Sequence, residues 1–123
     1  MSQDRDIIFA LACRDNREAL AFLHLLFKAA DAADNIHDDG DVEVASLVVD
    51  LVALPFNPFY KRHEGALHSL IVTAVLCWDV SNGMEKGPDR EHYSCQLEQV
   101  LFYVAMLCGG YQHGKAVVEA WNS

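Results

Sequence analysis

The chain has 123 residues, of which 52% are hydrophobic, and its formal net charge is −9. This length suits one domain, and the apolar content is enough to build a core, which argues against a disordered chain. The Lys and Arg residues are scattered among twice as many acidic ones, so no cationic surface is available for nucleic acid or for an anionic membrane. We therefore expect neither as a partner.

The first residues and the cysteines both indicate a cytoplasmic location. Residues 1–6 are polar and partly acidic, unlike the basic and then apolar start of a signal peptide. No stretch reaches the roughly 18 uncharged apolar residues of a membrane span. The four cysteines are Cys13, Cys77, Cys95 and Cys108, and none of them forms a C-x-x-C pair. This spacing argues against zinc binding. We therefore expect buried free thiols in a reducing compartment.

The first two helices are predicted from apolar spacing and a cap. The run at residues 7–12 predicts a short helix, since no other segment is available to pair with it as a strand. A longer helix begins after Asn16, whose side chain suits an N-cap, and ends near Asp39 and Gly40. Its inward stripe repeats every three or four residues and comprises Leu20, Leu23, Phe27 and Ala30.

A third helix is predicted over residues 42–54, followed by a break that contains prolines. We expect this helix to bury one apolar face, made of Val44, Leu47, Val48 and Leu51. Asp50 falls on its polar face, so we expect the carboxylate to be solvated. After the break at residues 55–58, Asn57 is placed to cap a helix whose first residue is Pro58.

Three further helices complete the prediction. Residues 66–80 are apolar on most sides, so this segment is expected to be the central and most buried helix. A helix over residues 89–108 is expected to face inward with Leu97, Val100, Leu101, Val104 and Leu107, and a short last helix covers residues 112–121. The fold class is therefore all-α: a single helical domain, residues 1–123, forming a compact bundle of five or six helices. Because the loops are short, most neighbouring helices should be antiparallel.

The segment 31–43 is the most unusual part of the sequence, because it holds six carboxylates and no Lys or Arg. Crowded carboxylates repel one another unless a cation is present, and Mg²⁺, Mn²⁺ or Ca²⁺ would bind such oxygen ligands. The alternative is a solvated acidic surface, which is the commoner role of acidic runs. Carboxylates near a helix C-terminus are disfavoured by the helix dipole, and this local cost favours a functional reason.

Helical phase selects the candidate ligands in this segment. If the stripe of the second helix is continued by three and four residues, Asp34 and His37 fall on its inward face. Asp38 lies one turn after Asp34, and Asp41 follows in the loop. We therefore predict a metal site formed by Asp34, His37, Asp38 and Asp41, with additional candidates Asp31, His68 and Asp79.

Two known motifs were tested against the same segment. An EF-hand loop aligned on Gly40 would lack both its starting Asp and its closing Glu. The pair His37-Asp38 is similar to that of HD phosphohydrolases, but the upstream His24 lies about 20 Å away along the same helix. No phosphate-binding loop or nucleophile elbow occurs, so we assign no catalytic residue and no cofactor-binding residue.

Four short motifs carry a resemblance to a known group of proteins. They are the acidic segment 34–41, the Asn-Pro-Phe-Tyr turn at 57–60, the pair Trp78-Asp79 and the pair Gly109-Gly110. Together they resemble a group of small phage or prophage proteins with a D-x-x-x-D-G-D segment, from which this chain differs by an extra acidic residue before Gly40. The resemblance implies a viral or prophage origin and an all-helical fold, but no activity.

Two functions follow from these features. The first is a phage- or prophage-related accessory protein that acts as an acidic interaction module and binds a protein partner or a second copy as a homodimer. The alternative is a divalent-metal protein, such as a phosphohydrolase, in which an ion held by Asp34, Asp38 and Asp41 activates water. His37 or His68 would then move the proton. The lack of a catalytic signature favours the first function.

Overall fold

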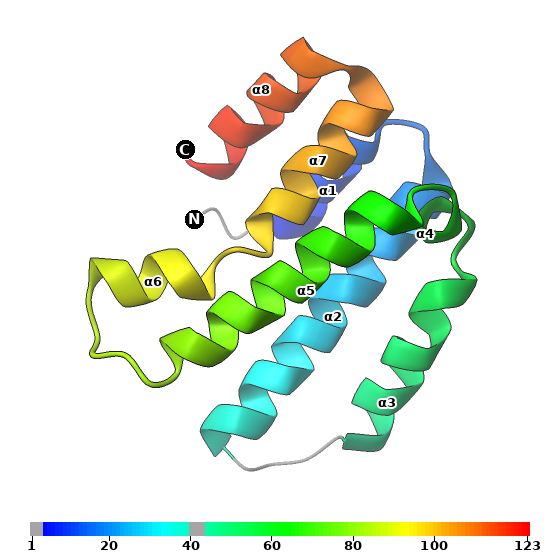
Figure 1. The fold of residues 1–123 in the computed structure, drawn as a ribbon. Coiled ribbons are helices and arrows are strands. Elements are labelled where there is room, and N and C mark those ends of the chain that lie inside the picture. The colour runs from blue at the N-terminus through cyan, green and yellow to red at the C-terminus, as the bar shows by residue number, and fades with distance from the viewer. Residues whose placement is uncertain (1–3, 40–43) are drawn as a thin grey trace. The chain divides into compact units, whose positions relative to one another are not determined.

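A computed structural model describes residues 4–39 and 44–123 of the chain (Figure 1). Within these residues every regular element is a helix and none is a strand, so the all-α prediction is confirmed. The helices are α1 (Arg5–Cys13), α2 (Arg17–Asp39), α3 (Val44–Ala53), η1 (Leu54–Phe56, a 3-10 helix), α4 (Pro58–Arg62), α5 (Glu64–Ser81), α6 (Pro88–Ser94), α7 (Glu98–Gly109) and α8 (Tyr111–Trp121). The described part of the chain thus holds eight α-helices, more than the five or six expected.

The helices pack as two compact units. One contains α1 together with α5 to α8, and the other, Asp15–Arg62, contains α2, α3, η1 and α4. The single domain expected over residues 1–123 stays a prediction. None of the described helices combines the length and the apolar composition needed to cross a membrane.

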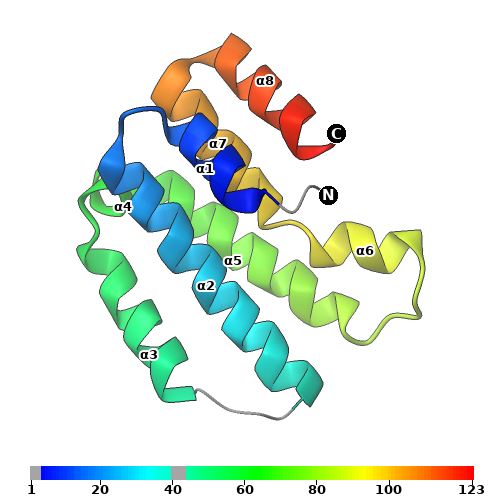
Figure 2. The same ribbon diagram turned by 180° about the vertical axis from the view of Figure 1, so that it is seen from behind.

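The unit made of α1 and α5 to α8 is built on the contact of α1 with α7 and α8 (Figure 2). Ile8, Phe9 and Ala12 form the buried stripe of α1, at the spacing of one helix face. The Phe9 ring stacks on that of Trp121 in α8, with 6.4 Å between the centroids. The buried side chains of α7 are apolar and comprise Val100, Leu101, Val104 and Ala105.

The Asp15–Arg62 unit is organised around α2. The Ala19 N–H donates to Asn16 Oδ1 over 2.9 Å, so the predicted N-cap of this helix is confirmed. In the first half of α2 the Phe22 ring lies 5.9 Å from the rings of both Phe59 and Tyr60, which α4 contributes. These aromatic contacts hold the short α4 against α2.

The predicted cap of α4 is also confirmed. The Tyr60 N–H donates to Asn57 Oδ1 over 2.9 Å, at the start of the helix that begins with Pro58. The Asn57 side chain makes a second bond, because its Nδ2 donates to the Glu18 carbonyl oxygen over 3.0 Å. Asn57 therefore both starts α4 and ties it to the first turn of α2.

The single helix predicted over residues 89–108 is wrong, because the chain forms α6 and α7 with a tight turn between them. The Glu98 N–H donates to the Cys95 carbonyl, three residues back, instead of continuing the four-residue pattern. Side chains compete for the carbonyls at this point: Gln96 Nε2 donates to the His92 oxygen over 2.8 Å. Ser94 Oγ bonds to the Glu91 oxygen in the same way.

The expected burial of the 66–80 segment is also wrong. Helix α5 buries Leu67, Ala74 and Ser81, which are seven residues apart and form one narrow seam. Its opposite side exposes apolar side chains that are each between 51% and 61% accessible, namely Val72, Val75, Leu76 and Val80. Helix α5 therefore has apolar side chains on a buried side and on an exposed side, and it is not buried all round.

Candidate functional site

The predicted acidic residues lie on the surface of α2. Asp34 and His37 are exposed, as are Asp31 and Asp38 one turn before and after. The expectation that Asp34 and His37 continue the inward face is therefore wrong. Leu23 and Phe27 of the predicted stripe are buried, as expected, and Leu20 and Ala30 are half-buried. The buried face also includes Ala19, Phe22, Leu26 and Ala29, and it continues through the half-buried Ala33 and Ile36 instead of Asp34 and His37.

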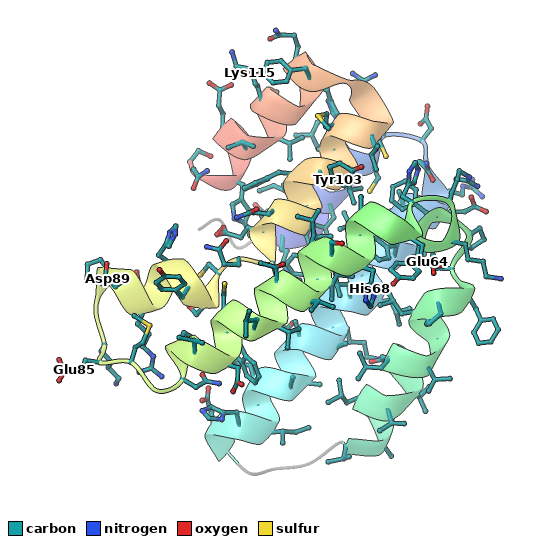
Figure 3. The ribbon with its side chains drawn as sticks, viewed as in Figure 1. Glu64, His68, Glu85, Asp89, Tyr103 and Lys115 are labelled. Atoms are coloured by element: carbon teal, nitrogen blue, oxygen red, sulfur yellow. The ribbon has the colours of Figure 1, made fainter. Side chains whose placement is uncertain are left out.

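The predicted metal ligands are only partly described. Asp41 lies outside the described residues, and the exposed His68 and Asp79 belong to α5 in the other unit; Figure 3 shows His68 one turn after Glu64. In residues 4–39 and 44–123, no three His, Cys, Asp or Glu side chains converge closely enough to hold an ion. A Mg²⁺, Mn²⁺ or Ca²⁺ site that includes Asp41 stays a prediction.

Helix α3 is turned the opposite way from the sequence prediction. Asp50, expected to be solvated, is only 6% exposed, and it is the one buried side chain of this helix. Val44, Val48 and Leu51, expected to be buried, are each about half exposed, and Leu47 is half-buried. The polar side of α3 therefore faces α2, which is its neighbour in both views of the ribbon (Figures 1 and 2).

The buried carboxylate of Asp50 is only partly compensated. Lys28 on α2 places its Nζ 3.5 Å from Asp50 Oδ1, while most of the Lys28 side chain remains in solvent. Asp50 Oδ2 is buried and has no hydrogen-bond partner among the described residues. Burying such an oxygen costs free energy, so the inward Asp50 does not by itself explain why α3 exposes its valines.

The outward side of α3 forms an extended apolar surface, which we call the α3 apolar face. It consists of side chains that are 49% to 71% exposed: Val44, Val48, Val49, Leu51 and Val52, continued by Phe56 of η1. Val44, Val48, Leu51 and Val52 follow the i, i+4, i+7, i+8 spacing of a helix-binding stripe. Contiguous apolar surface of this kind marks interaction sites in soluble proteins.

The two ends of the α3 apolar face differ in charge. The exposed Asp34 and Asp38 lie in the last turns of α2, and only residues 40–43 separate α2 from the start of α3. At the other end, Lys61 Nζ lies 5.6 Å from the centre of the Phe56 ring. Arg62 is paired with Glu18 over 3.2 Å. Asp34 and Asp38 thus precede α3 closely in the sequence, and Lys61 and Arg62, which follow it, each have a partner.

The sequence did not predict two contacts, that of Asp50 with Lys28 and that of Cys13 with Cys108, because each joins residues of different helices. The pairing of Asp50 with Lys28 joins α3 to α2, and the meeting of Cys13 with Cys108 depends on the packing of α1 on α7. Neither pairing leaves a local signature. The expectation of buried thiols is wrong for Cys95, which is exposed.

Comparison of the chain with protein-family models, curated proteins and solved structures found no match.

Proposed function

We propose that this chain is a protein-interaction module whose α3 apolar face binds a helical segment of a partner protein. The segment should carry an apolar stripe flanked by Lys or Arg. The observation that supports this most directly is the inverted orientation of α3, which buries its only charged side chain, Asp50, and exposes its valines. A partner helix would remove those valines from water and so offset the cost of that orientation.

The charge around the face supports a basic partner. Asp31, Asp34 and Asp38 are exposed in the second half of α2, the helix that packs against α3. The segment 31–43 holds six carboxylates and no Lys or Arg, so its negative charge would attract cationic side chains of a partner. Such complementarity speeds association and sets the direction in which the partner helix lies.

A second copy of the chain is a weaker candidate for the same face. Each copy carries a formal charge of −9, and pairing of two copies adds to the repulsion between them. Lys61 already contacts the Phe56 ring, and the following residue, Arg62, is paired with the Glu18 carboxylate. A homodimer would therefore bring few uncommitted cations to the carboxylates. The expected phage or prophage origin is compatible with an accessory role of this kind.

The proposal is tested with model helices. A labelled peptide of about 18 residues, with Leu at helical spacing and Lys elsewhere, is compared with a peptide in which Glu replaces every Lys. Fluorescence anisotropy should show that the Lys peptide binds, that added salt weakens it, and that the Glu peptide does not bind. Val48→Asp should weaken binding at least tenfold, by about 1.4 kcal/mol or more.

The matched control is Val72→Asp. Val72 lies on α5 and is exposed to the same extent as Val48, 51% in each case, so the two variants make the same substitution at equally exposed positions of different helices. Equal losses of binding in both variants would show that general hydrophobic contact, not the α3 apolar face, binds the peptide. Sedimentation of the free protein tests the homodimer: a dimer that Val48→Asp dissociates would identify a second copy as the occupant and refute the basic partner.

A further inference from the structure

Two thiols meet where the ends of α1 and α7 come together. Cys13 is the last residue of α1 and is fully buried, and Cys108 is the half-buried penultimate residue of α7. The two side chains lie close enough for each thiol to affect the pKa of the other. Since α1 and α7 pack together within one compact unit, this contact is part of the fold of that unit.

The surroundings hold the Cys13 end of α1 against the end of α7. A 3.1 Å hydrogen bond joins His113 Nε2 to the carbonyl oxygen of Ala12. The imidazole lies directly over Gly109, where a Cβ atom would come within 2.3 Å of the ring. Gly109 follows Cys108 in the chain, so the absence of a side chain there lets His113 reach α1.

Arg14 adds a cation and backbone strain to the same place. It follows Cys13 directly and has a φ of 55°, a value that side-chain-bearing residues rarely adopt. The positive charge of Arg14 acts on the Cys108 thiol and favours its thiolate. Of the two thiols, Cys108 is the more accessible and the only one with a cation acting on it.

We propose that Cys13 and Cys108 are a redox-active pair, which a hydroperoxide converts to a disulfide that fastens α1 to α7. In the first step the Cys108 thiolate attacks one peroxide oxygen, becomes a sulfenic acid and releases hydroxide. In the second step the Cys13 sulfur attacks the Cys108 sulfur, loses its proton and displaces water. Two thiols and one hydrogen peroxide thus yield one disulfide and two waters, with both sulfurs oxidised and the peroxide reduced.

The environment of the pair determines how fast it responds. Burial raises the pKa of Cys13 to about 12 and also raises the pKa of Cys108. At neutral pH both groups are therefore mainly protonated, and the thiolate is the reactive form. The pair should stay reduced during brief exposure and respond to sustained oxidation, more slowly than an exposed thiol of low pKa.

The bond should have a large effect on stability, because it would close a loop that contains most of the chain. Cys13 and Cys108 lie near opposite ends of the sequence, and cross-linking distant residues restricts the unfolded state strongly. We expect oxidation to raise the thermal midpoint by about 10 °C and dithiothreitol to reverse the change.

The test uses the full chain with Cys77→Ser and Cys95→Ser, which leaves only the two thiols of interest. The native protein is exposed to hydrogen peroxide, the remaining thiols are blocked with N-ethylmaleimide, and the peptides are mapped by mass spectrometry. The expected result is an intramolecular Cys13–Cys108 link, no blocked thiol and the higher midpoint. The same mapping on the wild-type chain covers the case in which the double variant does not fold.

The controls are Cys13→Ala and Cys108→Ser in the same background. With Cys13→Ala, Cys108 should proceed to the sulfinic acid, since no second thiol is present to resolve the sulfenic acid, and the midpoint should not rise. The proposal is overturned if both thiols remain available to the blocking reagent. It is equally overturned if Cys108 is over-oxidised while Cys13 stays reduced, or if links form only between chains.

Discussion

Lys28 Nζ and Asp50 Oδ1 lie 3.5 Å apart between α2 and α3, although Asp50 is buried and the Lys28 side chain is mostly in solvent. A half-exposed pair of this kind contributes only about 1 kcal/mol or less, because water screens the attraction. The other oxygen of Asp50 has no hydrogen-bond partner among the described residues. The buried carboxylate is thus a net cost to the free protein.

The first prediction concerns this cost. Asp50→Leu should raise the free energy of unfolding by about 1 kcal/mol, since it replaces an incompletely paired buried carboxylate with an apolar group. Lys28→Ala should lower the free energy of unfolding by about 1 kcal/mol, because it removes the cation paired with that carboxylate. Urea denaturation followed by circular dichroism measures both changes.

The double variant separates the pair from its surroundings. In the Asp50→Leu background, Lys28→Ala should change stability by less than about 0.5 kcal/mol, because the partner has gone. If Lys28→Ala costs as much there as in the wild-type chain, the Lys28 stem stabilises α2 by packing and the ion pair contributes little. A large loss of stability in Asp50→Leu alone would contradict the view that Asp50 is costly.

The second prediction compares the two asparagine caps. Asn16→Ala removes one hydrogen bond, from the Ala19 N–H, and should cost about 1 kcal/mol. Asn57→Ala removes two, from the Tyr60 N–H and to the Glu18 carbonyl, and should cost about 2 kcal/mol. Equal costs in denaturant titrations would show that the Asn57–Glu18 bond adds nothing in solution.

These caps also show what local sequence could predict. A side chain that bonds to a backbone N–H three residues later needs no information from the rest of the chain, so Asn16 and Asn57 could be identified in advance. The starts of α2 and α4 follow from such short-range signals. The all-helical class followed from the spacing of apolar residues along the chain, together with the lack of alternating strand patterns.

The orientation of α3 could not be predicted in this way. Its sequence offers an apolar side and a side with Asp50, and the usual rule buries the apolar side. The structure does the reverse, since Asp50 is 6% exposed and Val48 is 51% exposed. The prediction assumed that the apolar side of every helix packs into the core of the same chain, and α3 does not follow that assumption.

The third prediction tests the metal site expected from the acidic segment. If an ion is bound, Mg²⁺, Mn²⁺ or Ca²⁺ should raise the thermal midpoint of the wild-type chain by several degrees, and EDTA should reverse the rise. Asp41→Ala should lose that response if Asp41 is a ligand, and so should Asp34→Ala. A rise that is equally large in both variants would reflect general screening of the acidic surface, and it would remove Asp34 and Asp41 from the list of ligands.

The last prediction follows from the raised pKa of Cys13, which burial moves from 9.0 to about 12. Below pH 9 the thiol is protonated in both the folded and the unfolded chain, so its contribution to stability is fully present. As pH rises from 9 towards 12, the unfolded chain loses this proton while the folded one keeps it, and the contribution falls by at most about 1.4 kcal/mol per pH unit. Between pH 8 and about pH 10.5, the stability difference between wild type and Cys13→Ala should therefore shrink by up to about 2 kcal/mol in urea titrations under reducing conditions.

Lys and Tyr residues also titrate in this range, but they are common to both proteins and cancel in the difference. A difference that does not change with pH would mean that the Cys13 thiol ionises normally, and that water reaches the contact between α1 and α7.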